Sequence, residues 1–191
     1  MNLLAHSYLS FSDGQIVGNM IADYVRNADR EKLPMEVQKG IIIHREIDTY
    51  TDQHPVTHKA KKVFQPLVRL YSGAFVDVSM DYFLANDVAI HNETDWKKHT
   101  KHVYNTLWNY EEILPERFLH ILPKMEADDW LFNYRYDWGI KYSLQNVLNK
   151  AKYLEKDIPV FNSFIEEKDF LKECYDEFFP DLKNHIKYLK V

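Results

Sequence analysis

Apolar residues recur with the period of an α-helix along almost the whole chain, and this pattern constrains the fold most strongly. No segment combines a clean alternation of apolar and polar residues with the turn signals of a hairpin. The 191 residues include only five Gly and seven Pro, which is few for the many turns of a β-sandwich or barrel. We therefore predict an all-α fold in which residues 1–191 form a single compact helical domain.

Caps and breakers along the sequence predict about seven or eight helices. Ser12 and Gln15 have the spacing of a capping box that opens a helix, and Pro180 is expected to interrupt the last helix. The alternating aromatic residues of segment 130–138 are expected to lie in the core. The expected helical ranges are 12–27, 34–50, 56–71, 74–90, 94–114, a helix from 115, 139–154 and a helix after 159.

Charge and composition exclude several classes of protein. The net charge of −5 creates no overall field that would attract nucleic acid, so we expect no nucleic-acid partner. No uncharged apolar run approaches the ~20 residues of a membrane span, and residues 1–11 lack the positive charge of a signal peptide. The single cysteine, Cys174, cannot form an intramolecular disulfide. We expect a cytoplasmic protein with no membrane partner.

Three of the expected helices carry carboxylates on the face that should turn toward the core. In the helix over 34–50, His44 and Asp48 continue a stripe that begins with aliphatic residues. The neighbouring stripes hold Asp23 in one helix and Asp77 with Asp81 in another. A buried carboxylate needs a cation, a hydrogen-bond donor or a metal. The ligand set would suit Mn²⁺ or Mg²⁺, and the alternative is that each group is hydrogen-bonded to a neighbouring helix.

Two lysine-rich clusters have simpler interpretations. His99 and His102 have the i, i+3 spacing that could chelate a metal, but they lie among lysines, so we expect a solvated basic face. The first cluster contains Lys59, Lys61, Lys62 and Arg69, and the second contains Lys97, Lys98 and Lys101. The sequence contains no Gly-rich phosphate loop and no Glu-x-x-His pair of the di-iron bundles.

Four short motifs, in order over about the first 90 residues, resemble the acyl carrier protein phosphodiesterases, which are distant relatives of the HD-domain phosphohydrolases. Tyr82 departs from the resemblance, because that family usually has His there. The motifs are Asn2-Leu3-Leu4-Ala5-His6, Gly18-Asn19-Met20-Ile21-Ala22-Asp23, the run from Gly40-Ile41 through His44-Arg45-Glu46-Ile47-Asp48 to Thr51-Asp52-Gln53-His54-Pro55, and Asp77-Val78-Ser79-Met80-Asp81-Tyr82-Phe83-Leu84.

The resemblance implies an HD-domain-like fold and a metal-dependent phosphodiesterase, with Mn²⁺ as the expected ion and Mg²⁺ or another divalent metal as the alternative. The substrate would be holo acyl carrier protein, a component of fatty acid biosynthesis, and the products apo carrier protein and 4′-phosphopantetheine. Asp52 or Asp77 would orient or deprotonate water, and Arg45 would brace the phosphate. The implied metal ligands are His6, Asp23, His44, Asp48 and Asp81.

Binding an acidic carrier protein would require one of the two lysine-rich clusters, because the chain itself is acidic. Two other functions are compatible with the same residues. One is an HD-like hydrolase of a nucleotide or another small phosphoester, which carrier-protein dependence would distinguish. The other is a non-enzymatic helical binding module whose stripe carboxylates pair with basic residues, which metal content would distinguish.

Overall fold

The helices of the first half of the chain pair around two close glycine contacts. The computed structural model describes residues 1–189. Helices α2 (Asp13–Ile21) and α3 (Met35–Gln53) form the most extensive contact between elements. A methyl group at Gly18 would collide with the Val37 carbonyl, and one at Gly40 would collide with the Gln15 carbonyl. The absence of side chains at both positions lets the two backbones touch.

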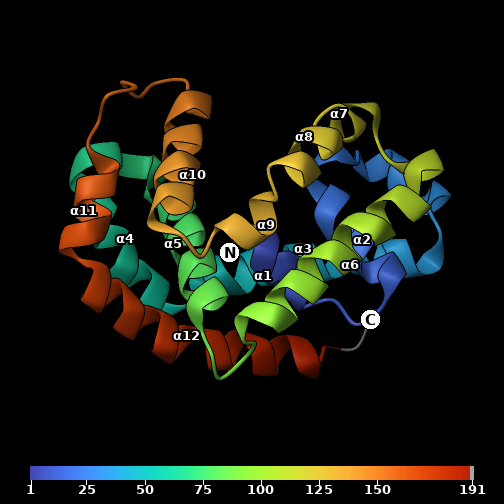
Figure 1. Ribbon diagram of the computed structural model, residues 1–191, viewed down its shortest axis with the longest axis horizontal. Helices are drawn as coiled ribbons and strands as arrows, with labels where there is room; N and C mark the ends of the chain where they lie inside the picture. Colours follow the sequence, from blue (N-terminus) through green and yellow to red (C-terminus); the bar gives the residue numbers. More distant parts are fainter. Residues whose placement is uncertain (190–191) are drawn as a thin grey trace.

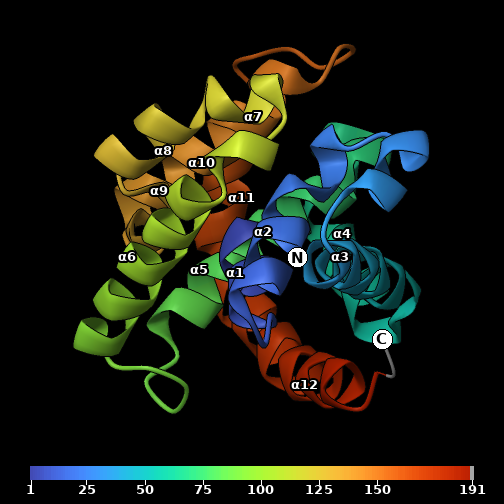
Figure 2. The same ribbon diagram turned by 90° about the vertical axis from the view of Figure 1, so that its right-hand side faces the viewer.

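Helix α5 contacts α1, α4, α10 and α12 (Figure 1). Helix α12 runs along one edge of the molecule and packs on α3, α4 and α5, while α6 and the short helices α7–α9 lie on the other side of α1 and α2 (Figure 2). The bounds are α1 (Leu3–Tyr8), α4 (Pro55–Val68), α5 (Ser72–Asn86), α6 (Glu93–Asn109), α7 (Glu116–Leu119), α8 (Leu122–Ala127), α9 (Trp130–Asn133), α10 (Asp137–Lys150), α11 (Val160–Glu166) and α12 (Lys168–Lys187).

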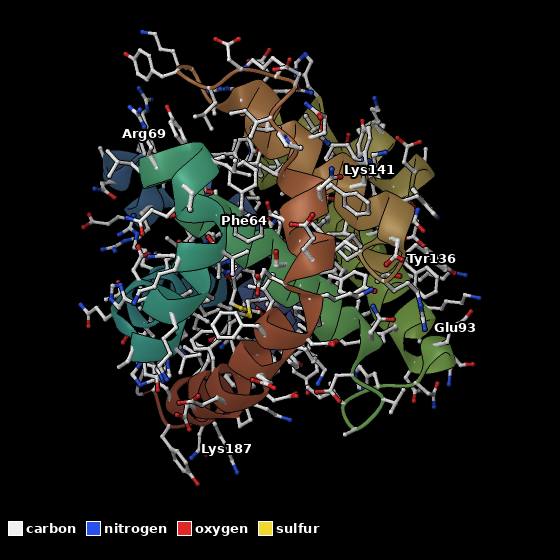
Figure 3. The ribbon with its side chains drawn as sticks, turned by 90° about the vertical axis from the view of Figure 1, so that its left-hand side faces the viewer. Phe64, Arg69, Glu93, Tyr136, Lys141 and Lys187 are labelled. Carbon is white, nitrogen blue, oxygen red and sulfur yellow. The ribbon has the colours of Figure 1, made fainter. Side chains whose placement is uncertain are left out.

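The all-α prediction is confirmed, since the described residues 1–189 contain helices and no strand. One continuous core holds most of the bulky residues; Phe64 points into it from α4, whereas Arg69 and Lys187 lie at the periphery (Figure 3). The Ser12 cap is also confirmed, because the Ser12 hydroxyl accepts the Gln15 N–H at 3.3 Å. Within this described part, no helix has the length and apolar character needed to cross a membrane.

Several predicted boundaries were wrong. The expected helix over 12–27 ends at Ile21 and gives way to 3₁₀ turns, and α1 was missed because six residues carry too little periodicity. The helix expected from 115 is three short helices. Pro180 does not break α12, because it lies on the exposed side, where water can bond the carbonyl that it leaves unpaired. The aromatic residues of segment 130–138 are only partly core, since Trp138 is 60% exposed.

Candidate functional site

Two histidines and one carboxylate converge where α1 meets α3. The rings of His6 and His44 stack with their centroids 4.1 Å apart. The Nε2 atom of His6 lies 3.3 Å from Asp48 Oδ1, and the Nε2 atom of His44 lies 3.2 Å from Asp48 Oδ2. One ligand atom from each of these three residues falls within 4.8 Å of the others. We call this set the His–His–Asp group.

Asn19, near the end of α2, orients both imidazoles by bonding their Nδ1 atoms. Its side-chain N–H groups donate to the His6 carbonyl and the Ser10 hydroxyl, so its Oδ1 atom faces His6 Nδ1 at 2.8 Å. The backbone carbonyl of Asn19 lies 2.8 Å from His44 Nδ1. Both partners are oxygen acceptors, which places a proton on each Nδ1. In the neutral rings, both Nε2 lone pairs are then directed toward Asp48, as metal ligation requires.

The electrostatics of the group also fit a divalent ion. Burial disfavours the charged form of His44, but its hydrogen bonds to Asp23 and Asp48 outweigh this and raise the His44 pKa to about 9. Burial lowers the pKa of His6, which keeps that ring neutral. Burial would raise the Asp48 pKa, yet the two histidines hold it well below its usual range. A positive charge is thus already held between the carboxylates, and a metal ion would take the place of the His44 proton.

Asp23 lies at the open edge of the group. Its Oδ1 atom is 3.5 Å from His44 Nε2, and its side chain is 81% exposed. The hydrogen bond from His44 lowers the Asp23 pKa, so this carboxylate stays ionised. The predicted ligands His6, His44 and Asp48 are therefore brought together, with Asp23 beside them.

The structure places Asp81 elsewhere. Its buried carboxylate accepts the backbone N–H groups of Asn2, Leu4 and Ala5 at the start of α1. Burial raises the pKa of Asp81 to about 7, against these amide donors, which favour the charged form. Asp81 thus fixes the position of α1, the helix that carries His6, rather than contributing an oxygen to the His–His–Asp group.

The three residues expected to act on water or phosphate also have other partners. Asp77 accepts a 2.8 Å hydrogen bond from the Met1 amino group. Asp52 lies at the exposed end of α3 and binds Lys61 at 2.8 Å. Arg45 is exposed and donates to the Asn27 side chain. Within residues 1–189 none of the three is part of the His–His–Asp group.

Sequence reasoning missed Asn19 and misjudged His99. Asn19 stands inside a quoted motif, but its helix position gave no reason to assign it a role. His99 was expected on a solvated face; instead its Nε2 atom bonds the Ser7 hydroxyl at 3.0 Å, and burial lowers its pKa to about 4. His102 is exposed as expected and pairs with Asp13 at 3.0 Å.

Tyr82 and the lysine-rich clusters lie apart from the group. The Tyr82 hydroxyl donates to Asp137 at 2.9 Å, linking α5 to α10. Both clusters are partly neutralised, because Lys61 binds Asp52 and Lys97 binds Glu93. Such exposed pairs contribute little to stability, and salt screens them.

Comparison with known proteins identifies the family of the chain. The family profile described as acyl carrier protein phosphodiesterase matches residues 1–182. The chain is 28% identical to the acyl carrier protein phosphodiesterase of Enterobacter sp. (strain 638), with 98% of each chain covered. It is 27% identical to that of Yersinia pestis over the full length of both, and 26% identical to that of Escherichia coli O6:H1 over 94% of each. No solved structure matches the chain. The chain belongs to the acyl carrier protein phosphodiesterase family.

Proposed function

We propose that this protein hydrolyses the phosphodiester between 4′-phosphopantetheine and the serine of holo acyl carrier protein. The products would be apo carrier protein and 4′-phosphopantetheine. The observation that carries the proposal is the His–His–Asp group, in which Asn19 directs two imidazole Nε2 atoms toward one carboxylate. Family membership supplies the carrier-protein substrate.

The donor set fits a divalent metal, and we propose Mn²⁺. His6, His44 and Asp48 would hold it, because two imidazole nitrogens and a carboxylate suit borderline ions and their ligand atoms already lie within 4.8 Å of one another. When bound, the ion would lower the pKa of a coordinated water and neutralise charge on the phosphate. The exposure of Asp48, at 48% of its side chain, leaves the group open to a substrate.

Three residues around the His–His–Asp group would orient water, position the imidazoles and bind the phosphate. Asp23 is ionised and exposed at the edge of the group, so it is placed to accept a hydrogen bond from the attacking water and orient it. Asn19 keeps both Nδ1 atoms protonated and acts as a positioning residue. Arg45 would leave its contact with Asn27 to reach a phosphate oxygen.

Intact-mass measurement of holo acyl carrier protein tests the proposal directly. Incubation with the wild-type protein and Mn²⁺ should remove the mass of phosphopantetheine, and a chelator should prevent this. His44→Ala should abolish the reaction, whereas His102→Ala should retain it, because His102 is also paired with an aspartate but lies outside the group.

Persistence of the holo mass with every divalent metal tested would reject the carrier-protein substrate. Cleavage that continues in the presence of chelator would reject the metal requirement instead. Equal loss of activity in both histidine variants would show that the effect is not specific to the His–His–Asp group.

A further inference from the structure

A cavity of about 690 Å³ lies between the start of α1 and the segment from α8 to α10. This volume is typical of pockets that bind small molecules. Asn2 and Leu3 form one wall together with Val78 of α5, and Trp130 and Trp138 contribute aromatic surface on the opposite side. The aromatic segment that was expected to fill the core thus borders an open space.

A close helix contact and a hydrogen bond fix the walls of the cavity. Helices α9 and α10 approach so closely that a methyl group at Gly139 would collide with the Asn133 carbonyl. The Tyr134 hydroxyl accepts a 3.0 Å hydrogen bond from the Asn2 side chain, which joins the two walls. The cavity therefore has a defined shape before any ligand enters.

The cavity adjoins the His–His–Asp group through two elements. Asn2 and Leu3 precede His6 on α1 by about one helical turn. On α5, Val78 lines the cavity, and the preceding Asp77 accepts a hydrogen bond from the Met1 amino group, at the start of the segment that leads to His6. One short helix therefore carries both a lining residue of the cavity and a histidine of the His–His–Asp group.

The chemistry of the walls points to a neutral, amide-containing ligand. Asn146 and Ser143 offer neutral polar groups beside the aromatic surface. Asn2 and Asn133 add two further amide side chains to the lining. The one lysine, Lys150, is outnumbered by Asp128 and Asp129, which disfavours a phosphate here.

We propose that this cavity binds the pantetheine arm of the substrate while the phosphodiester lies at the His–His–Asp group. The inference rests on the proposed function and adds the position of the arm. Pantetheine has two amides, hydroxyl groups and an apolar dimethyl centre, and it carries no charge. Those groups match the amide side chains, the Ser143 hydroxyl and the aromatic walls of the cavity better than a charged or wholly apolar ligand would.

Two variants on one helix test this position. Asn146→Phe would fill the cavity from α10, whereas Asn149→Phe places the same side chain on an exposed part of the same helix. Pantetheine should change the tryptophan fluorescence of the wild type saturably, because two of the four tryptophans, Trp130 and Trp138, line the cavity. Asn146→Phe should weaken pantetheine binding at least tenfold, and Asn149→Phe should leave it unchanged.

The same variants should differ with holo carrier protein. We expect Asn146→Phe to raise KM at least tenfold while metal content stays that of the wild type. Ala127→Phe, which fills the cavity from α8, should have the same effect and serves if Asn146→Phe does not fold, as judged by circular dichroism.

The outcomes separate the two proposals. If the wild type cleaves holo carrier protein but the filled variants keep the same KM and pantetheine affinity, the arm position is wrong and the proposed function stands. The same holds if pantetheine does not bind the wild type at all. If the wild type does not cleave holo carrier protein, the proposed function fails, and the arm position with it.

Discussion

Two pairs of histidines in this protein invite comparison, because each lies beside oxygen-bearing partners, yet of these two only the first assembles a potential metal site within residues 1–189. In the His–His–Asp group, the Nε2 atoms of His6 and His44 face the two oxygens of one carboxylate. On α6, His99 bonds the Ser7 hydroxyl of α1, and His102 separately bonds Asp13 at the start of α2. We call this second region the His99–His102 pair.

The two pairs differ in the hydrogen-bond partners of their imidazole rings. Asn19 holds Nδ1 of both His6 and His44, so the two opposite nitrogens have to point the same way. In the His99–His102 pair each Nε2 atom already has its own partner. Spacing along one helix brings His99 and His102 close without making them converge. His6 and His44 converge because both rings bond Asn19, which we call the shared anchor.

The largest expected difference between the two regions is in metal affinity. His44→Ala removes one of the three proposed ligands and should weaken Mn²⁺ binding by at least about a hundredfold. His102→Ala should change it by less than about twofold, because exposed pairs contribute little. Equilibrium dialysis measures the Mn²⁺ affinity of both variants. Comparable losses of affinity would show that the His–His–Asp group binds metal no better than the His99–His102 pair.

Removing the shared anchor should have the next largest effect. In Asn19→Ala the His6 ring loses its Nδ1 partner, and we expect metal affinity to fall about 10–100-fold. Asn27→Ala, at an exposed position that contacts Arg45, is the matched control and should bind metal like the wild type. An unchanged affinity in a folded Asn19→Ala protein would show that the rings converge without the anchor.

The His–His–Asp group also depends on the close contact of α2 with α3. Gly40→Ala forces a methyl group against the Gln15 carbonyl and should lower the free energy of unfolding by about 1–3 kcal/mol. Gly73→Ala, whose methyl group would meet only the flexible end of Lys61, should change it little. Urea denaturation measures both variants, and equal stabilities would contradict the proposed constraint.

The His99–His102 pair should show itself through acid sensitivity. The His99 pKa is about 4 in the folded protein, below the ordinary value of 6.5, because the ring is buried. The unfolded chain therefore takes up the proton first as pH falls. The contribution of His99 to the free energy of unfolding is fully present above about pH 6.5 and is lost as the pH falls toward 4. The loss amounts to about 2 kcal/mol between about pH 7 and pH 5.

The matching variant removes this contribution. His99→Gln should lose that part of the pH dependence in urea denaturation. His58→Gln, at an exposed position on α4, should retain it. A wild-type slope that persists in His99→Gln would assign the acid sensitivity to another group.

Periodicity predicted the parts of the fold that repeat over several turns. It placed α3 and the i, i+4 pair of His44 and Asp48 correctly, because a long helix fixes the direction of its side chains. It missed α1 and the division of α7, α8 and α9, since four to six residues give too few repeats to distinguish a helix from a turn.

The sequence predicted which side chains of the candidate site lie on long helices, but not which partners they have. Asp48 and Asp81 have equivalent patterns in the sequence, yet one faces two imidazoles and the other faces three backbone amides. A stripe of carboxylates shows that a buried charge needs compensation, but not which group supplies it. That choice depends on the contact between α1 and α5, in which Leu4 and Asp81 are 77 residues apart in the sequence.

Asp81 links the candidate site to a helix that is distant in the sequence. Its carboxylate accepts backbone N–H groups at the start of α1, so the position of His6 depends on the packing of α5 against α1. A change at Asp81 would therefore act on the His–His–Asp group without touching it, through the position of one short helix. An ion that binds only the folded chain would in turn stabilise the contact between α1 and α5.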